Sequence, residues 1–377
     1  MAHQIKNRVL MNIILTGATG TLGSKILFSL FEQKSQSIKK VFLPVRSKNS
    51  TTPAERIQKM LHSEYIPIFI KNNLPSILDR IQVIDAAYLL EPTSFLKEEK
   101  IDFFIHSAGF VNLSTDHDAK EDIFKENFEF TKNIFQAYTP FIKKFVYIST
   151  AFAAGDIGGI IDNDYSNEHK GKYRNHYEAS KHASEKFLMQ AGTDHNIPVQ
   201  ILRPSVLGGN IKDHPHFFIS KYMVFYLFAK FFHNSNSKDR IRISTTDTAG
   251  LNIIPTDYAA QVIVKAMETD IGQLNIVHSK ETNLMTGMSK IFDIVGFDNF
   301  SFTPEKINAV TGFKSELEKF YYETIGVHLN PYLTSKPNQW DTTLLESIIP
   351  IPTYDLEEYL SQTVTFAKSK KFRSQQW

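Results

Sequence analysis

The 377-residue chain contains no cysteine, and this absence excludes several kinds of chemistry. Without cysteine there is no disulfide, no zinc site built on thiolates and no covalent intermediate on a cysteine sulfur. The chain also has no large excess of positive or negative charge, because 42 Lys and Arg residues nearly balance 40 Asp and Glu residues. With a formal net charge of +2 and no basic block, the composition predicts no nucleic-acid partner.

Long hydrophobic runs are missing as well. The most apolar segment, Phe217–Phe232, is 16 residues long and includes Lys221 and Lys230, so it falls short of the roughly 20 residues that a membrane-spanning helix needs. Met1–Leu10 has basic residues but no apolar core of signal-peptide length, and we expect a cytoplasmic protein. With 42% hydrophobic residues, the chain can form one large domain or two closely packed ones.

A glycine-rich segment near the start is the first strong feature that is present. Met11–Leu15 reads as a short buried strand, and Ser24–Phe31 has apolar residues at helical spacing. Between them, Gly17 permits a tight turn, Gly20 lets backbone N–H groups approach a pyrophosphate, and Gly23 lets the helix lie close to the strand. The alternative is a strand-to-helix turn that binds nothing. The residues expected to bind a dinucleotide are Thr16, Gly17, Thr19, Gly20, Thr21, Leu22 and Gly23.

The second predicted strand, Lys40–Val45, leads into Arg46 and Lys48, where the adenosine ribose lies in such a fold. An acidic residue there would bind a ribose 2′-hydroxyl, whereas an arginine accommodates a 2′-phosphate. We therefore expect NADP(H) rather than NAD(H), with Arg46 and Lys48 among its contacts. The alternative is an ordinary solvated arginine at the end of a strand.

Three further strands are predicted over Ile81–Ile84, Ile101–Ile105 and Lys144–Ile148. Asp85 follows the first of them and could contact the adenine edge. Small residues after the second strand would leave room for the cofactor; they are Ser107, Ala108 and Gly109. Because helical stretches follow the strands, the sequence predicts an α/β fold with a Rossmann-type parallel sheet wound on both faces.

Tyr177 and Lys181 are four residues apart and would share one face of a helix. A phenol with a pKa near ~10 is a poor acid-base catalyst at neutral pH, but an adjacent ammonium group lowers that pKa. Thr150, at the end of a predicted strand, can donate a second hydrogen bond to a substrate carbonyl oxygen. The alternative is that this tyrosine and lysine share a helix face by chance.

Together these features resemble an extended short-chain dehydrogenase/reductase. The matching positions are the three glycines, Asp85, His106–Gly109, Asn127, Thr150, Gly155, Tyr177, Lys181 and Arg203-Pro204-Ser205. The resemblance implies catalytic roles for Thr150, Tyr177 and Lys181. It also implies cofactor contacts by Asn127, Tyr177, Lys181, Pro204 and Ser205. One departure is Phe130, where the family usually has a glycine.

Within that family the chain is similar to fatty acyl-CoA reductases and to the reductase domains that end carboxylic acid reductases and peptide synthetases. This similarity rests on Arg46, a helical insert over Thr52–Arg80, Ser149–Phe152 and Asn252–Tyr258. It implies NADPH-dependent reduction of an acyl thioester, carried by coenzyme A or a carrier protein, to an aldehyde and, after a second round, an alcohol. Because the chain has no cysteine, hydride would attack the thioester directly.

The resemblance also implies an NADP(H)-binding domain over 10–205 and 251–279, and a smaller, mainly helical substrate lobe over 206–250 and 280–377. In that lobe Phe217–Phe232 can be a buried helix, the wall of an acyl-chain tunnel, or a helix in peripheral contact with a membrane. The tail Lys368–Trp377 is expected to be frayed. Chain length of the acyl group and oligomeric state are not predicted.

Other functions stay open at this point. They are a nucleotide-sugar epimerase or dehydratase, a hydroxysteroid dehydrogenase, and a non-catalytic NADP(H)-binding regulator. An aromatic lobe argues against a sugar nucleotide, and an intact Thr150, Tyr177 and Lys181 set argues against a regulator. No metal is expected, because His214 and His216 flank a proline in what we interpret as a loop.

Overall fold

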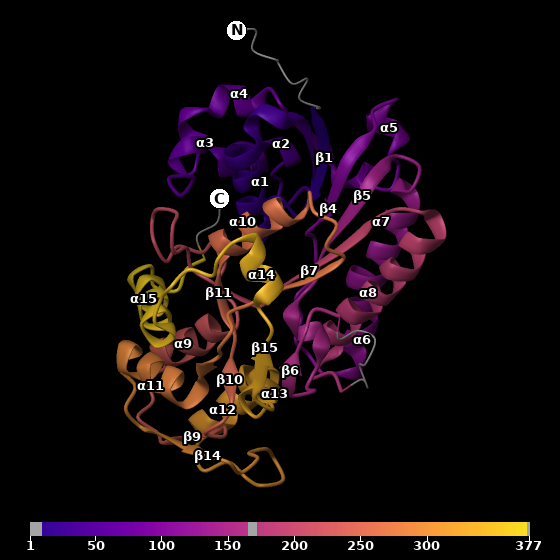
Figure 1. Cartoon of the computed structure of the whole chain (residues 1–377). Helices are drawn as coiled ribbons and strands as arrows, with labels where there is room; N and C mark the ends of the chain where they lie inside the picture. The colour runs from indigo at the N-terminus through magenta and orange to yellow at the C-terminus, as the bar shows by residue number, and fades with distance from the viewer. Residues whose placement is uncertain (1–9, 165–171, 375–377) are drawn as a thin grey trace.

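The computed structural model describes residues 10–164 and 172–374. At its centre lies a parallel sheet of seven strands in the order β12-β7-β5-β4-β1-β2-β3 (Figure 1). Its strands are β1 (Met11–Thr16), β2 (Ile38–Val45), β3 (Ile81–Asp85), β4 (Ile101–His106), β5 (Ile142–Ile148), β7 (Val199–Pro204) and β12 (Gln273–Ile276). Strand order reverses between β1 and β4, and ligands of doubly wound sheets bind at the carboxyl ends of the strands at that point.

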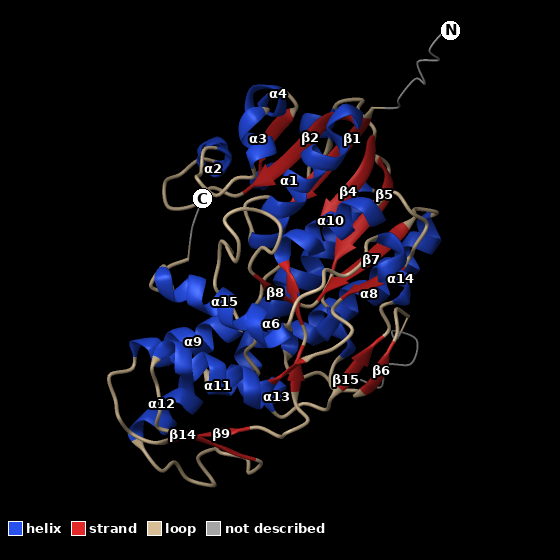
Figure 2. Cartoon of the chain, turned by 60° about the vertical axis from the view of Figure 1, so that its left-hand side comes forward, coloured by secondary structure: helices blue, strands red, loops and turns tan. Residues whose placement is uncertain are grey.

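Helices cover both faces of the sheet (Figure 2). In β1, Ile13 and Leu15 belong to one buried cluster and Ile14 to another, as the alternation of a strand covered on both faces requires. The first face carries α1 (Thr21–Lys34), α10 (Thr256–Ala266) and α14 (Thr343–Ile348), and the second carries α5 (Thr93–Leu96), α7 (Phe130–Tyr138) and α8 (His176–His195). The predicted Rossmann-type fold is confirmed.

The helical insert between β2 and β3 consists of α2 (Pro53–Leu61), α3 (Ile68–Asn72) and α4 (Leu74–Leu78). A capping box starts α2: the Thr52 hydroxyl accepts a hydrogen bond from the Glu55 N–H, and the Glu55 carboxylate accepts one from the Thr52 N–H at 2.7 Å. Ile57, Met60 and Leu61 anchor α2 on the main core. The insert is thereby held beside the glycine-rich turn.

A second buried cluster forms a mainly helical lobe at the carboxyl edge of the sheet. Its helices are α9 (Phe225–Asn234), α11 (Leu284–Val295), α12 (Glu316–Thr324), α13 (Gly326–Leu333) and α15 (Leu356–Ser369). Four short strand pairs frame it: β8 (Val206–Gly208) with β11 (Ile253–Pro255), β9 (Ile241–Ser244) with β14 (Phe300–Thr303), β10 (Gly250–Leu251) with β13 (Thr282–Asn283), and β6 (Gly159–Ile161) with β15 (Asn338–Trp340).

The aromatic segment Phe217–Phe232 supplies much of the lobe core. Phe225, Phe228 and Phe232 of α9 are buried against α11 and α12, whereas Lys221 and Lys230 are exposed. The interpretation as a buried helix therefore fits, and the apolar side of α9 is turned into the protein rather than toward a lipid surface. Peripheral membrane contact stays an untested prediction.

The expectation about the C-terminal tail can be compared with the structure. The tail stays packed further than expected, because Phe372 is 1% exposed and lies beside Tyr222 and His233. The N-terminal stretch before Leu10 and the last three residues lie outside the described part of the chain. Within that described part, no helix combines the length and the apolarity that crossing a membrane requires.

Candidate active site

The glycine-rich turn between β1 and α1 leaves no room for side chains on its inner side. Gly17 has a φ of +72°, and a Cβ there would lie 2.8 Å from the backbone nitrogen of Ala108. A Cβ on Gly23 would lie 2.1 Å from the carbonyl oxygen of Gly17. Gly20 is the N-cap of α1, and no side chain caps that helix. The first N–H groups of α1 are thus available to an anion.

Thr16 ties the turn to the loop that follows β4. Its hydroxyl lies 2.8 Å from His106 Nδ1 and accepts a hydrogen bond from the Ala108 N–H at 3.1 Å. His106 Nε2 lies 3.2 Å from the Thr131 hydroxyl. Burial, helped by the Lys181 charge, lowers the pKa of His106 to about 3, so this imidazole is neutral. The loop holding Ser107, Ala108 and Gly109 is thereby fixed against the glycine turn.

A cationic hollow of about 390 Å³ opens beside the same turn. Thr19, Gly20 and Thr21 form one side, and the basic residues on its walls are Lys48, Arg56, Lys59 and Lys221. No carboxylate is among the described residues that line it. Such a concentration of positive charge at a helix N-terminus suits the phosphates of a dinucleotide.

The sequence analysis did not predict that Arg56 and Lys59 would line this hollow. The one feature that could have indicated it is that both are basic and lie about one helical turn apart in the insert, on α2. The guanidinium of Arg56 donates to the Thr19 hydroxyl at 2.8 Å and to the Arg46 carbonyl oxygen at 2.5 Å. Burial and the nearby Arg46 cation lower the pKa of Arg56. Two crowded cations favour an anion between them.

Arg46 and Asp85, both predicted to contact the cofactor, have different surroundings. The side chain of Arg46 is 82% exposed, and its Nη1 lies 3.8 Å from Glu126 Oε2. Asp85 caps a short 3₁₀ turn, where its carboxylate accepts a hydrogen bond from the Ala87 N–H at 3.0 Å. The structure therefore gives Asp85 a structural partner, and it places Arg46 in an exposed ion pair outside the residues that line the hollow.

Asn127 lies in a π-helical turn, Lys125–Glu129, that joins α6 (His117–Phe124) to α7. Its amide group accepts from the Phe110 N–H at 2.8 Å and donates to the Phe110 carbonyl at 3.0 Å and to the Ser180 hydroxyl at 3.1 Å. Phe130, the departure from the family pattern, packs its ring 5.8 Å from the His106 ring. Asn127 thus positions the loop after β4 against α8.

The end of β5 and the first turns of α8 bring the predicted catalytic residues to one edge of the sheet. Lys181 is buried, donates to the Ile148 carbonyl at 2.8 Å and lies 4.1 Å from the centre of the Tyr147 ring. Thr150 is 7% exposed, and its hydroxyl accepts a hydrogen bond from the Phe152 N–H at 3.3 Å. Tyr177 precedes Lys181 by one turn on the same face of α8.

The expected tuning of Tyr177 by Lys181 is not found in this structure. Burial raises the pKa of the Tyr177 phenol, and the Glu178 carboxylate raises it further. Burial also lowers the pKa of Lys181 to about 7, so that near neutral pH its ammonium is partly lost. Tyr177 consequently keeps its proton, which is the form required of a proton donor.

Two buried hydroxyl groups at the carboxyl ends of β5 and β7 lack a hydrogen-bond partner among the described residues. They belong to Ser149 and Ser205, which are 5% and 6% exposed. Pro204 is buried at the end of β7, next to Ser205. Unpaired buried hydroxyls cost free energy unless a ligand or water meets them. Together with the uncapped helix and the cationic hollow, they fit a dinucleotide lying along this edge.

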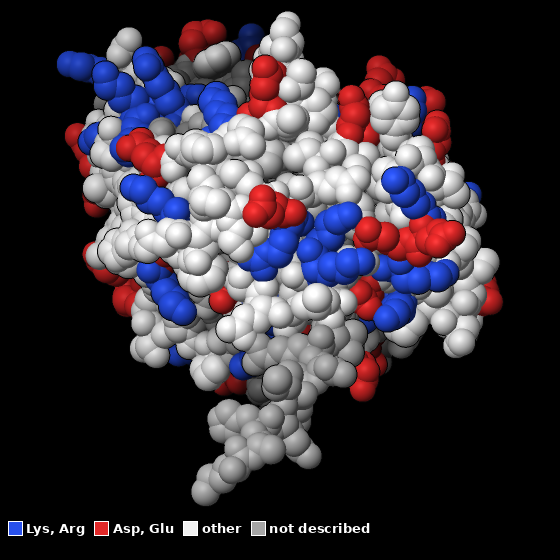
Figure 3. Space-filling view, turned by 90° about the horizontal axis from the view of Figure 1, so that it is seen from above, with Lys and Arg blue, Asp and Glu red and all other residues white. Residues whose placement is uncertain are grey.

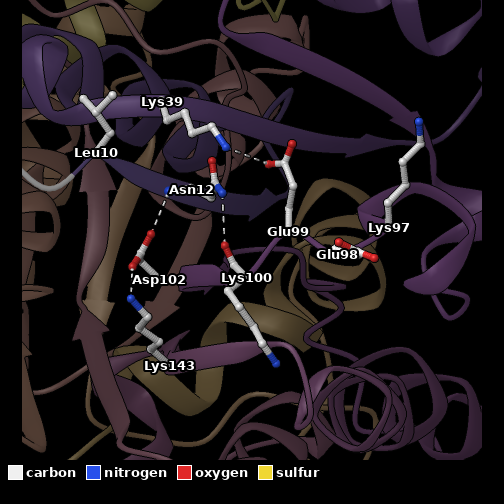
Figure 4. A pocket seen from close by; sticks show the side chains of 9 residues that line it. All are labelled: Leu10, Asn12, Lys39, Lys97, Glu98, Glu99, Lys100, Asp102 and Lys143. Carbon is white, nitrogen blue, oxygen red and sulfur yellow. Dashed lines mark hydrogen bonds and ion pairs between the residues drawn. The ribbon is translucent and has the colours of Figure 1, made fainter.

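Another hollow, of about 670 Å³, lies at the opposite edge of the sheet (Figure 4). Charges of both signs line it, and Lys143 and Asp102 are paired there at 2.7 Å. Figure 3 likewise shows Lys and Arg interleaved with Asp and Glu on the face it presents. Because ligands of such sheets bind at the carboxyl ends, we assign this hollow no part in the site. Among residues 10–164 and 172–374, no three His, Asp or Glu side chains gather as a metal site would require.

The chain is similar to known proteins over much of its length. A family model described as "Male sterility protein" matches residues 15–263. Fatty acyl-CoA reductase 1 of Mus musculus is 27% identical in an alignment 236 residues long that covers 54% of this chain and 44% of that protein. The isonitrile lipopeptide synthase of Mycobacterium tuberculosis is 27% identical in an alignment 214 residues long that covers 52% of this chain and 8% of that protein. The chain thus matches less than half the length of these relatives.

Solved structures share the fold at low identity. The terminal R domain of the myxalamid pathway has a TM-score of 0.68 at 19% identity, covering 97% of this chain and 92% of that one. A thiolation-reductase di-domain from an archaeal peptide synthetase has a TM-score of 0.69 at 20% identity, covering 96% and 76%. UDP-glucuronic acid 4-epimerase from Bacillus cereus, in complex with NAD, has a TM-score of 0.62 at 17% identity, covering 97% and 99%. The chain belongs to the male sterility protein family, a nicotinamide-cofactor-binding branch of the extended short-chain dehydrogenase/reductase oxidoreductases.

Proposed function

We propose that this protein is an NADPH-dependent reductase of acyl thioesters. The observation that carries the proposal is the adjacency, along one edge of the sheet, of the cationic hollow at the glycine turn and the Thr150, Tyr177 and Lys181 group. The relatives named fatty acyl-CoA reductase support the thioester as substrate. The basic residues of the hollow support the 2′-phosphate form of the cofactor.

A dinucleotide held by the N–H groups at the start of α1 and by the cationic hollow would supply the hydride for reduction of the thioester carbonyl carbon. Thr150 and Tyr177 donate hydrogen bonds to the carbonyl oxygen, and Tyr177 transfers its proton as negative charge develops there. The product of this step is a hemithioacetal, which collapses to an aldehyde and the free thiol of coenzyme A or of a carrier protein. Since the chain has no cysteine, no acyl-enzyme thioester precedes the hydride step.

We also propose a division of labour within the chain. The part over 10–205 and 251–279 binds the cofactor, and the lobe over 206–250 and 280–377 binds the acyl group. The helix α14 is the exception, because Leu345 and Ile348 pack into the first cluster beside α10. The apolar lobe core gives a sugar nucleotide few polar partners, so we favour an acyl substrate over the epimerase reaction.

The direct test is the consumption of NADPH with a panel of acyl-CoAs of different chain length, with aldehydes in parallel and NADH as control. Turnover of acyl-CoA with release of free thiol is the expected result, and the products show whether reduction stops at the aldehyde. Turnover of aldehydes or ketones alone would contradict the proposal. An acyl carrier protein loaded with the same chains extends the panel to the second carrier.

The residues of the cationic hollow give a test of cofactor preference. We expect Arg56→Ala to weaken NADPH binding at least about tenfold more than NADH binding, because a charge-assisted hydrogen bond contributes roughly 1.5–3 kcal/mol. Arg46→Ala should show the same selectivity at smaller magnitude, since that side chain is exposed. Calorimetric titration of both cofactors measures the two ratios. Equal losses for NADPH and NADH would refute the 2′-phosphate role.

A further inference from the structure

One lobe residue, Tyr332 on α13, contacts both catalytic segments. Its ring lies 5.5 Å from the ring of Phe152, edge to face, and Phe152 follows Thr150 by two residues. Its hydroxyl accepts a hydrogen bond from Asn175 Nδ2 at 2.7 Å. Tyr332 is only 8% exposed, so these contacts are made inside the protein at the junction of the lobe and the sheet.

Asn175 and Glu178 lie on either side of Tyr177 in the first turn of α8. Asn175 is the N-cap of the helix, and its Oδ1 accepts a hydrogen bond from the Glu178 N–H at 3.0 Å. The same amide group therefore caps the catalytic helix with its oxygen and reaches Tyr332 of the lobe with its nitrogen. Movement of the lobe would pull on the turn that carries Tyr177.

A buried ion pair lies beside the contact between Asn175 and Tyr332. Glu178 is 0% exposed, and its carboxylate accepts from the Arg174 guanidinium at 3.2 Å and from the Arg174 N–H at 2.8 Å. The guanidinium of Arg174 also lies 5.2 Å from the centre of the Tyr332 ring. Burial raises the pKa of Glu178, while Arg174 and the Tyr332 hydroxyl oppose that rise. Tyr332 thus holds a buried charge in place as well as the helix cap.

A second set of contacts fixes the position of α13 next to the segment that carries Thr150. β15 follows α13 and pairs in parallel with β6, and the Lys336 N–H donates to the Asp156 carboxylate at 3.1 Å. Asp156 in turn lies 3.4 Å from the Arg174 guanidinium. The lobe is therefore joined to the two catalytic segments through one connected set of contacts.

We propose that Tyr332 is a positioning residue. Through it, the packing of the lobe against the sheet determines the orientation of Tyr177 and Thr150. Its role in turnover rests on the proposed reductase function, but its effect on α8 does not. Removal of the hydroxyl keeps the edge-to-face contact of the ring with Phe152 and frees the first turn of α8.

The test uses Tyr332→Phe, with Tyr322→Phe as a matched control. Tyr322 is in the same lobe, is 6% exposed, and its hydroxyl accepts from the Ser244 N–H at 2.9 Å and donates to the Arg242 carbonyl at 3.0 Å. Both variants lose one buried hydroxyl with two partners. Only Tyr332 reaches α8, so only its variant should accelerate amide hydrogen exchange over residues 175–182. Equal exchange in the two variants would overturn the proposal, whatever the enzyme reduces.

Turnover gives an independent readout. We expect Tyr332→Phe to lower kcat about tenfold while leaving the KM for NADPH unchanged, and Tyr322→Phe to leave both constants near the wild-type values. Asn175→Ser keeps an N-cap but loses the amide donor, so it should reproduce the kcat loss. The double variant should lose no more than either single one, because both remove the same contact. Additive losses, or a loss confined to KM, would contradict a positioning role.

Discussion

Replacing Tyr177 by phenylalanine is expected to lower kcat by about 10²–10⁴-fold, the range that a positioned general acid contributes. The change deletes one hydroxyl group and keeps the ring, so the packing of α8 should survive. Because burial and Glu178 raise the pKa of this phenol, the wild-type group is a neutral donor at physiological pH. Cofactor affinity should change little, since the residues that we propose to bind the phosphates lie at the glycine turn and on α2.

Steady-state kinetics and cofactor titration on the same preparation separate these two effects. Tyr138→Phe is a suitable control, because that phenol is also buried, at the end of α7 on the same face of the sheet, and its hydroxyl donates to the Leu89 carbonyl at 2.8 Å. The control should lose stability and keep its turnover. Full activity in Tyr177→Phe would remove the phenol from the mechanism and leave Thr150 as the proton-donating candidate.

Local patterns were enough to predict the sheet and the glycine turn. Strands such as Met11–Thr16 and Ile101–His106 are short apolar runs buried on both faces, and glycine positions are tied to backbone geometry that only a few residues permit. The aromatic segment was harder to interpret. Its apolar content is clear in sequence, but whether Phe228 faces core or lipid depends on α11 and α12, which come more than 50 residues later.

The parts of the site that escaped prediction depend on contacts between distant segments. Arg56 reaches Thr19 across 37 positions, and Asn175 reaches Tyr332 across 157. The pKa of Tyr177 was predicted in the wrong direction because helical spacing brings an ammonium group near but says nothing about burial. In the folded chain burial dominates both groups, raising the pKa of the phenol and lowering that of Lys181.

The glycine turn offers the second large effect, through Gly23→Ala. Gly23 lies inside α1, where alanine is normally favoured over glycine by about 1 kcal/mol. Here the new Cβ would lie 2.1 Å from the Gly17 carbonyl oxygen and 2.6 Å from its carbonyl carbon. Both are backbone atoms of the turn, so neither can swing aside as the end of a flexible side chain would. The helix must instead move away from the turn.

We therefore expect Gly23→Ala to reverse the usual propensity gain and to destabilise the protein by about 1–3 kcal/mol, the typical cost of overpacking. The N–H groups at the start of α1 would move with the helix, so NADPH and NADH affinities should fall together, unlike in Arg56→Ala. Gly272→Ala is the control, because a Cβ at Gly272 meets nothing within 4 Å. Thermal unfolding and cofactor titration measure both consequences. A Gly23→Ala protein with wild-type stability and affinity would mean that α1 does not need to lie against the turn, and the dinucleotide cradle inferred from these glycines would then be wrong.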